Sequence, residues 1–325
     1  MNKTDKMKSF IANTYEGPTP FSFWTHYPEC DREPEKIAQV SYDLYKDFDL
    51  DFLKTMNNGM YAIEDYGAKV DFSEIEKGGV AKVVETPINR YEDWANLPLL
   101  DLTEAAILQR ELDYLERLLN LTKGEVPVLM TVFSPITTAD KLSGGRLREH
   151  IEQDESGILL AAIEKIAQTT AALAKKAIEM GADGIYLASQ MSSTDKVSIE
   201  DYKKYGKPFD LQVIEAANGG WMNTVHIHGE NIMFDLLKDY PLPIINWHIG
   251  EAKPELLEGL QASGKIVMGG IERMDITAND REALKTQVTR DIEDTKGKNQ
   301  LLLTPGCVIR RPFDTDTIRF IQGLL

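Results

Sequence analysis

Two histidines in one short apolar segment are the residues most able to do chemistry in this sequence. His226 and His228 lie two positions apart in residues 223–231, where a run of β-forming residues predicts a strand. Side chains two apart on a strand leave the same face, so both imidazoles would point the same way. Imidazole is a common ligand of Zn²⁺, and the pair could supply half of a metal site. The pair could equally form a hydrogen-bonded wall without a metal.

A cysteine about eighty residues further along the chain could supply a third ligand. Cys307 follows the apolar run 301–303 and the sequence Thr-Pro-Gly. Two histidines and one thiolate form a set of intermediate softness that suits Zn²⁺ and leaves one position open for substrate. Glu230 and Glu272 are candidates for that fourth position in the resting state. The alternative is that Cys307 is simply a small buried residue.

A scaffold that positions these residues is indicated by eight short β-rich runs separated by helical patterns. The predicted strands cover residues 19–24, 49–54, 126–133, 184–188, 224–227, 243–247, 265–269 and 300–304. This alternation predicts an α/β protein of the (β/α)₈ barrel type, with residues 1–325 as a single domain. Residues 55–125 interrupt the alternation with a turn signal at Gly78 and Gly79 and two short β-like runs near 68–72 and 80–85. We expect this stretch to be an insertion after the second strand, over one mouth of the barrel.

Other polar and aromatic residues follow the predicted strands. Active sites of such barrels lie at the carboxyl ends of the strands, and every histidine except His150 falls at or just after such an end. We therefore predict catalytic roles for Glu272, Lys54 and His26. We predict substrate contacts for Trp24, Ser134, Ser189, Gln190, Trp247 and His248. The alternatives are a solvated ion pair for Lys54 and Glu272, a helix cap for Ser134 and barrel packing for the two tryptophans.

The overall charge limits the partners. The formal net charge is −16 at pH 7, which argues against nucleic acid or an anionic membrane surface. It also weighs against a highly anionic substrate, unless basic residues are concentrated locally. Two cysteines and an N-terminus without an apolar segment predict a cytoplasmic protein with no membrane insertion. The oligomeric state is left open.

Several short motifs, in their order and spacing, resemble the uroporphyrinogen decarboxylase superfamily over most of the chain. The motifs are Phe23-Trp24-Thr25-His26, Phe133-Ser134-Pro135, Gly181-Ala182-Asp183-Gly184, His226-Ile227-His228-Gly229, Gly269-Gly270-Ile271 and Thr304-Pro305-Gly306-Cys307. The resemblance implies a (β/α)₈ barrel. It also implies one of two activities, namely decarboxylation in the haem pathway or zinc-dependent transfer of a methyl group from a corrinoid protein to a thiol.

The departures from the two branches favour the second activity. The decarboxylases carry an arginine-rich segment near the N-terminus, whereas this chain has no arginine before Arg32. The methyltransferases show His-x-Cys and a later Cys, which His226, His228 and Cys307 resemble with histidine in the second position. We therefore expect zinc and a corrinoid as cofactors, a small-molecule substrate and a corrinoid protein as partner. A tetrapyrrole decarboxylase without metal and a ligand-binding barrel without turnover are the alternatives.

Overall fold

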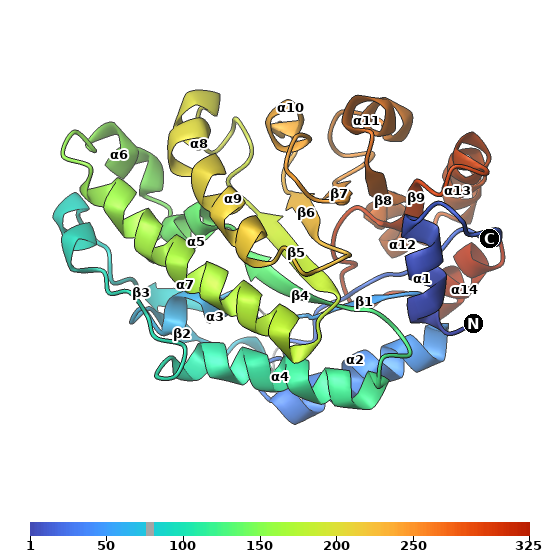
Figure 1. The fold of residues 1–325 in the computed structure, drawn as a ribbon, viewed down its shortest axis with the longest axis horizontal. Coiled ribbons are helices and arrows are strands. Elements are labelled where there is room, and N and C mark those ends of the chain that lie inside the picture. Colours follow the sequence, from blue (N-terminus) through green and yellow to red (C-terminus); the bar gives the residue numbers. More distant parts are fainter. Residues whose placement is uncertain (76–80) are drawn as a thin grey trace.

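A curled sheet of seven parallel strands forms the centre of the molecule in the computed structural model, which describes residues 1–75 and 81–325 (Figure 1). The strand order is β1-β4-β5-β6-β7-β8-β9, and each neighbouring pair is parallel. All strands therefore end on the same side of the sheet. Their bounds are β1 Leu53–Lys54, β4 Val128–Phe133, β5 Gly184–Ser189, β6 Thr224–Ile227, β7 Ile244–Trp247, β8 Ile266–Ile271 and β9 Leu301–Pro305.

The first predicted strand, residues 19–24, is present only as irregular extended chain. Phe21 forms an isolated parallel bridge with Leu303 of β9, and the Leu303 amide donates to the Pro20 carbonyl at 2.8 Å. On the other side, the Asp51 amide donates to the Phe21 carbonyl at 2.9 Å. Pro20 has no N–H of its own, so a regular ladder cannot pass through it. This segment lies between β9 and the start of β1, which is consistent with a TIM-like barrel.

The other seven predicted strands are present, with the second reduced to the two residues of β1. The residues of β4, β5, β6, β7 and β9 are all buried, because helices cover one side of the sheet and side chains fill the other. Burial on both faces explains why these strands appear in the sequence as continuous apolar runs.

Helices form the outer layer, and the longest, α7, lies beside α9 (Figure 1). The helices are α1 Lys3–Ile11, α2 Pro34–Phe48, α3 Tyr61–Glu64, α4 Ala106–Thr122, α5 Pro135–Leu142, α6 Leu147–Glu152, α7 Ile158–Met180, α8 Ile199–Tyr205, α9 Lys207–Ala216, α10 Phe234–Leu237, α11 Leu256–Ser263, α12 Arg273–Ala278, α13 Arg281–Thr295 and α14 Thr315–Gln322. None of the helices in the described part of the chain combines the length and the apolar character needed to cross a bilayer.

The segment between β1 and β4 contains several small elements. They are α3, the antiparallel pair β2 Lys69–Asp71 and β3 Lys82–Glu85, the 3₁₀ helix η2 Tyr91–Asn96, and α4. Helix α4 packs along α2 in the outer layer, so that part of the segment belongs to the helical shell. An insertion over one mouth stays a prediction. The predicted turn at Gly78 and Gly79, and Val80 of the predicted run 80–85, lie outside the described residues.

Strand register fixes which side chains share a level at the carboxyl ends. Ala188 of β5 pairs with His226 of β6, which in turn pairs with Asn246 of β7. At the opposite ends, the Asp183 carboxylate accepts the Val128 amide at 2.9 Å and so links β4 to the start of β5. These contacts hold the neighbouring strands in register and so determine the surroundings of His226.

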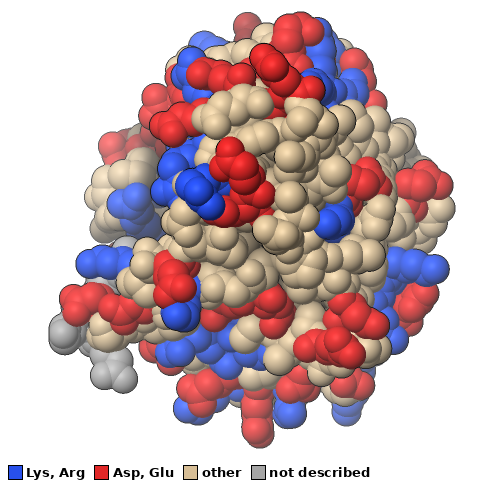
Figure 2. Space-filling view, turned by 90° about the vertical axis from the view of Figure 1, so that its left-hand side faces the viewer, with Lys and Arg blue, Asp and Glu red and all other residues tan. Residues whose placement is uncertain are grey.

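The surface has mixed charge in spite of the net negative total. Figure 2 shows acidic and basic side chains interspersed over one face, with uncharged areas between them. Several charged side chains are paired along helices, such as Lys175 with Glu179. Exposed pairs of this kind contribute little to stability because water screens them.

A buried carboxylate on α4 holds the loop that follows β1. Glu111 is 1% exposed and accepts a hydrogen bond from Asn57 Nδ2 at 2.7 Å and another from Arg110 Nε at 2.8 Å. Burial raises the pKa of Glu111 to about 7, although Arg110 and Asn57 act in the opposite direction. The loop at Asn57 is thus tied to a group that titrates near neutral pH.

We predict that Glu111→Gln changes how stability depends on pH. Below pH 7 the folded protein holds a proton on Glu111 that the unfolded chain releases above its ordinary pKa of 4.5. The free energy of unfolding should therefore fall as pH rises through this window, by at most about 1.4 kcal/mol per pH unit from this group. Glutamine cannot titrate, so urea unfolding from about pH 5 to 8 should show the variant gaining stability relative to the wild type.

The control is Glu116→Gln, an exposed position on the same helix. It should leave the pH profile unchanged. Parallel profiles for the wild type and Glu111→Gln would contradict the prediction.

Candidate metal centre

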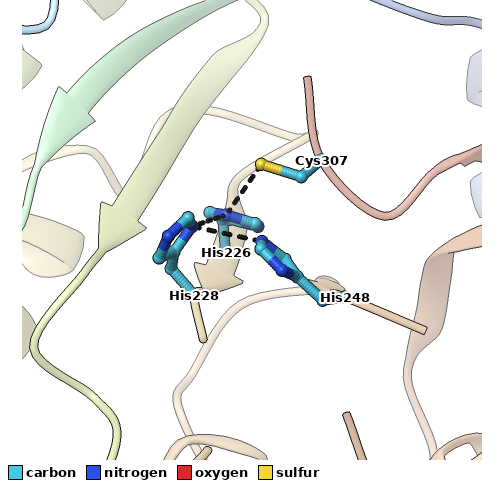
Figure 3. A group of neighbouring side chains, drawn as sticks. All are labelled: His226, His228, His248 and Cys307. Atoms are coloured by element: carbon cyan, nitrogen blue, oxygen red, sulfur yellow. Dashed lines mark hydrogen bonds between the residues drawn. The ribbon is translucent and has the colours of Figure 1, made fainter. Parts of the chain in front are cut away.

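Four side chains converge at the carboxyl ends of three strands (Figure 3). His226 lies in β6, His228 just after it, His248 just after β7 and Cys307 just after β9. One ligand atom of each lies within 4.8 Å of the ligand atoms of the other three. His228 Nδ1 is 3.4 Å from His226 Nε2 and 3.1 Å from His248 Nε2, and Cys307 Sγ is 3.9 Å from His226 Nε2.

A glycine allows the cysteine to approach the histidines. Gly306 follows β9, and a Cβ atom placed there would lie 2.7 Å from the Trp247 carbonyl oxygen and 3.0 Å from the Cα of His248. Real Cβ atoms essentially never come as close to backbone as the first of these distances. The main chain that carries Cys307 can therefore lie directly against the main chain that carries His248.

Asn246 determines which nitrogen of His226 faces the cluster. The Asn246 side chain donates from Nδ2 to the Met268 carbonyl at 2.6 Å, so its Oδ1 is left as an acceptor for His226 Nδ1. Tyr186 also donates to this Oδ1 at 2.6 Å, and its ring stacks on His226 with centroids 5.4 Å apart. The Nε2 lone pair of His226 is therefore free and points at the other three side chains. Metal-binding histidines are commonly oriented in this way.

His248 has a carboxylate behind it. Its Nδ1 lies 3.8 Å from Glu251 Oε2, while its Nε2 faces His228. Arg273 holds this carboxylate with two hydrogen bonds, from Nε at 2.8 Å and from Nη2 at 2.9 Å. Glu251 is thus fixed in place and can orient the imidazole.

The three imidazoles are in the form that binds metal. Burial, followed by the neighbouring His248 and His228, lowers the pKa of His226 well below its usual value. Burial and His228 lower the pKa of His248 to about 4, and burial and Arg273 lower that of His228. Neutral imidazole has a free lone pair, so the cluster offers three nitrogen donors and one sulfur donor without needing to lose imidazole protons.

The four donors fit Zn²⁺. Nitrogen and sulfur ligands in a group of four are typical of zinc, whereas Mg²⁺ and Ca²⁺ prefer oxygen. Burial raises the pKa of Cys307, with Arg273 opposing it, so the free thiol is protonated at neutral pH. A metal ion would displace that proton.

A cavity of about 290 Å³ adjoins the cluster, and His226, His228 and Cys307 form part of its wall. Lys54 and Tyr186 also line it, and the Lys54 ammonium lies 5.5 Å from the Trp24 ring centroid and 4.7 Å from that of Tyr186. Burial lowers the pKa of Lys54 to about 7. The cavity therefore joins a candidate metal site to a buried amine.

Several predicted site residues meet in this cavity. Those that line it are Trp24, His26, Lys54, Gln190, His226, His228 and Cys307. His248, predicted as a substrate contact, belongs instead with the candidate metal ligands. Neither Glu230 nor Glu272, the two candidates for a fourth ligand, belongs to that group of four.

Ser134, Ser189 and Trp247 are absent from the described cavity wall. The Ser134 hydroxyl donates to the buried Asp210 carboxylate at 2.6 Å, and the Ser189 hydroxyl lies 2.7 Å from that of Tyr202, which also bonds to Asp210. The Trp247 indole donates to the Pro254 carbonyl at 2.9 Å. Their substrate contacts stay predictions without a contact that supports them.

The sequence reasoning missed Asn246, Tyr186, Glu251 and Arg273. A signal existed for Asn246, because an amide inside an otherwise apolar strand must find a partner. Tyr186 similarly carries a hydroxyl in a buried strand. Glu251 lies in a loop and Arg273 is the first residue of α12. Charged residues are ordinary at both kinds of position, so nothing in the sequence distinguishes these two.

The uroporphyrinogen decarboxylase (URO-D) family model matches residues 23–321 of this chain. None of the curated proteins compared with the sequence matches it significantly.

Solved structures with a similar fold include three of interest. A methyltransferase from Methanosarcina mazei has a TM-score of 0.82 at 15% identity, covering 100% of this chain and 98% of that one. A B12-independent methionine synthase from Shewanella sp. W3-18-1, in complex with selenomethionine, has a TM-score of 0.56 at 15% identity, with 94% and 90% covered. A putative vitamin-B12 independent methionine synthase from Listeria monocytogenes has a TM-score of 0.54 at 12% identity, and the match covers 95% of this chain and 98% of that one. At these identities the likeness concerns the fold.

We predict that the purified protein binds about one zinc ion per chain. Replacing one donor breaks the converging set, so His226→Ala, His248→Ala and Cys307→Ser should each lose most of the metal. Asn246→Leu keeps all four donors but removes the group that orients His226, together with the hydrogen bonds to Met268 and Tyr186, and should weaken zinc binding about 10- to 100-fold. Elemental analysis after dialysis and competition with a chromophoric chelator measure both effects.

The matched control is Glu272→Gln, which should keep the zinc affinity of the wild type. Full zinc retention in His248→Ala together with loss of zinc in Glu272→Gln would show that Glu272, and not His248, is the ligand.

Proposed function

We propose that this chain, which belongs to the uroporphyrinogen decarboxylase family, is a zinc-dependent methyltransferase that moves a methyl group from a corrinoid or similar donor to a thiol. The observation that carries the proposal is the convergence of three imidazoles and one thiol beside a cavity, with His226, His228 and Cys307 in the cavity wall. The candidate zinc ligands are His226, His228, His248 and Cys307, and a substrate thiol would bind as a fifth ligand or in place of one of these four. The fold shared with a methyltransferase and two methionine synthases supports methyl transfer, whereas the corrinoid donor has no support from the two synthases, which are described as B12-independent.

The reaction needs a deprotonated sulfur, because the thiolate is the nucleophile. Zinc, when bound, would supply this chemistry by favouring the thiolate form of a substrate thiol at neutral pH. In the transfer, a sulfur–carbon bond forms as the bond between the methyl group and its donor breaks, and the thiol proton passes to solvent. The protein's own residues hold the reactants, since Asn246 and Tyr186 fix His226 while Trp24 and Tyr186 enclose one side of the cavity.

The size of the cavity supports a small acceptor. About 290 Å³ is at the lower end for sites that bind drug-sized molecules. A macrocycle of four pyrroles with eight acid side chains is much larger than this space. Together with the absence of an arginine before Arg32, this places tetrapyrrole decarboxylation second. A barrel that binds a ligand without turnover is the third candidate.

The setting of the reaction follows from the charge and sequence arguments. We propose a cytoplasmic enzyme with a small-molecule acceptor and a corrinoid protein as the candidate donor. The net charge of −16 speaks against nucleic acid and anionic membranes as partners.

We predict that binding of a thiol to the zinc-loaded protein releases about one proton at neutral pH. The free thiol has a pKa of about 8.5 and the metal favours its ionised form, so protonated thiol must lose its proton on binding. Calorimetry in buffers with different ionisation enthalpies measures the proton count and needs no knowledge of the methyl donor. Thiols that bind without proton release, or fail to bind the zinc form, would contradict the proposal, and chelator-treated protein is the control.

We predict that the protein does not decarboxylate uroporphyrinogen at a measurable rate, with or without zinc. A cavity of about 290 Å³ favours a ligand smaller than the macrocycle, and the arginine-rich N-terminal segment of the decarboxylases is missing. Product analysis by liquid chromatography tests this. Turnover by metal-free protein would move the decarboxylase interpretation to first place.

A further inference from the structure

The cavity beside the candidate metal centre has a charge opposite to that of the whole protein. The chain has 52 acidic and 36 basic residues. Nevertheless, three cationic side chains line the cavity, namely Lys54, Arg273 and Arg310, and among the described residues no aspartate or glutamate does. A cleft lined by charges of one sign concentrates ligands of the opposite charge.

Among the three cations that line the cavity, Lys54 is the one that is both buried and without a counter-charge. It is 8% exposed, and its ammonium donates only to Thr131 Oγ1 at 3.2 Å and to the Thr55 carbonyl at 3.4 Å. Within residues 1–75 and 81–325, no carboxylate comes within 4.0 Å of it. Its surroundings are the rings of Trp24 and Tyr186. Burying an amine in this way is costly, since a charged group normally stays paired or in water.

The other cations nearby are less suited to pair with a ligand inside the cavity. Arg273 is held by Glu251 in a two-pronged ion pair. Arg310 is exposed, so water screens its charge. Lys141, like Lys54, forms no ion pair among the described residues; it donates to the Gly59 carbonyl at 2.8 Å and sits 3.7 Å from the Phe133 ring centroid. It differs from Lys54 in that it is not part of the cavity wall.

We propose that Lys54 is the counter-ion for an acid group of the substrate, and that the acceptor is a small carboxylic acid that carries a thiol. The anion site stands on the cavity itself, whereas its combination with a thiol rests on the proposed function. In this role Lys54 determines specificity, and its buried ammonium is paired only when the substrate is present.

The arrangement of side chains gives the acceptor two ends. The Lys54 ammonium and the His226 imidazole both contact the ring of Tyr186, and all three side chains line the same cavity. A molecule with its acid group at Lys54 can therefore present a second group to the cluster of His226, His228, His248 and Cys307. A cavity of about 290 Å³ restricts this molecule to a short chain between the two ends.

The test compares three probes on metal-free protein, so that the acid group cannot bind a metal instead. The probes are 3-mercaptopropionate, 3-mercapto-1-propanol, which has the same length and thiol but no charge, and propionate, which has the acid alone. The wild type should bind the two acids about 10- to 100-fold more tightly than the alcohol, as expected for a charge-assisted hydrogen bond out of water. Calorimetry or ligand-observed NMR measures the binding.

The decisive variant is Lys54→Met, which keeps the length of the apolar stem and removes the charge. It should lose the preference for acids while binding the alcohol as the wild type does. Lys175→Met changes the net charge equally at an exposed site on α7 and should keep the preference. Because Lys54 is a buried amine without a counter-charge, Lys54→Met should also melt no lower than the wild type.

Two outcomes overturn the assignment of Lys54. Equal binding of acid and alcohol by the wild type, or an acid preference that survives in Lys54→Met, would remove Lys54 as the counter-ion. If Lys54→Met does not fold, the wild type alone decides, since 3-mercaptopropionate should raise its melting temperature more than 3-mercapto-1-propanol. An intact acid preference without proton release by thiols on zinc-loaded protein would refute the proposed function and leave the anion site standing.

Discussion

The amide of Asn246 is the interaction on which the site depends. It connects four adjacent strands, because it donates to the main chain of β8 from β7, orients His226 of β6 and accepts the hydroxyl of Tyr186 of β5. Such a network is favourable only when every member is satisfied, and here each polar atom of the amide has a partner. The direction of one buried side chain thus decides which nitrogen of His226 is available. The parallel arrangement of the strands brings the remaining donors to the same end of the sheet.

Local charge differs from total charge in this molecule. A net charge of −16 argues against anionic partners at long range, yet the cavity has cations and, in the described part of the chain, no acidic lining. The two observations agree once distance is considered. Surface charges are screened within about 10 Å in salt solution, while buried groups interact strongly over short distances. The net charge therefore predicts how the protein meets large polyanions, whereas the charges that line the cavity predict which small ligand it binds.

Much of the fold was predictable because buried parallel strands appear in the sequence as apolar runs. The first predicted strand failed to form a ladder at Pro20, where a backbone donor is missing. His226, His228 and Cys307 were recognisable because they end such runs. The role of His248 was not, since strand ends can be found in a sequence but the main-chain approach at Gly306 cannot. Ser134 and Ser189 were misleading in a similar way, because their partners, Asp210 and Tyr202 respectively, come from helices whose positions depend on packing.

The contact at Gly306 has a consequence for the choice of metal ion. Strands β7 and β9 are not neighbours, since β8 separates them, yet their trailing main chains touch where Gly306 meets Trp247 and His248. The main-chain positions of Cys307 and His248 are therefore held close together, and only side-chain rotation can change the separation of their donor atoms. Such a frame adapts less readily to an ion with longer bonds to nitrogen and sulfur than one in which the main chain can also move. We expect ionic radius, more than intrinsic affinity, to govern which divalent metal this site retains.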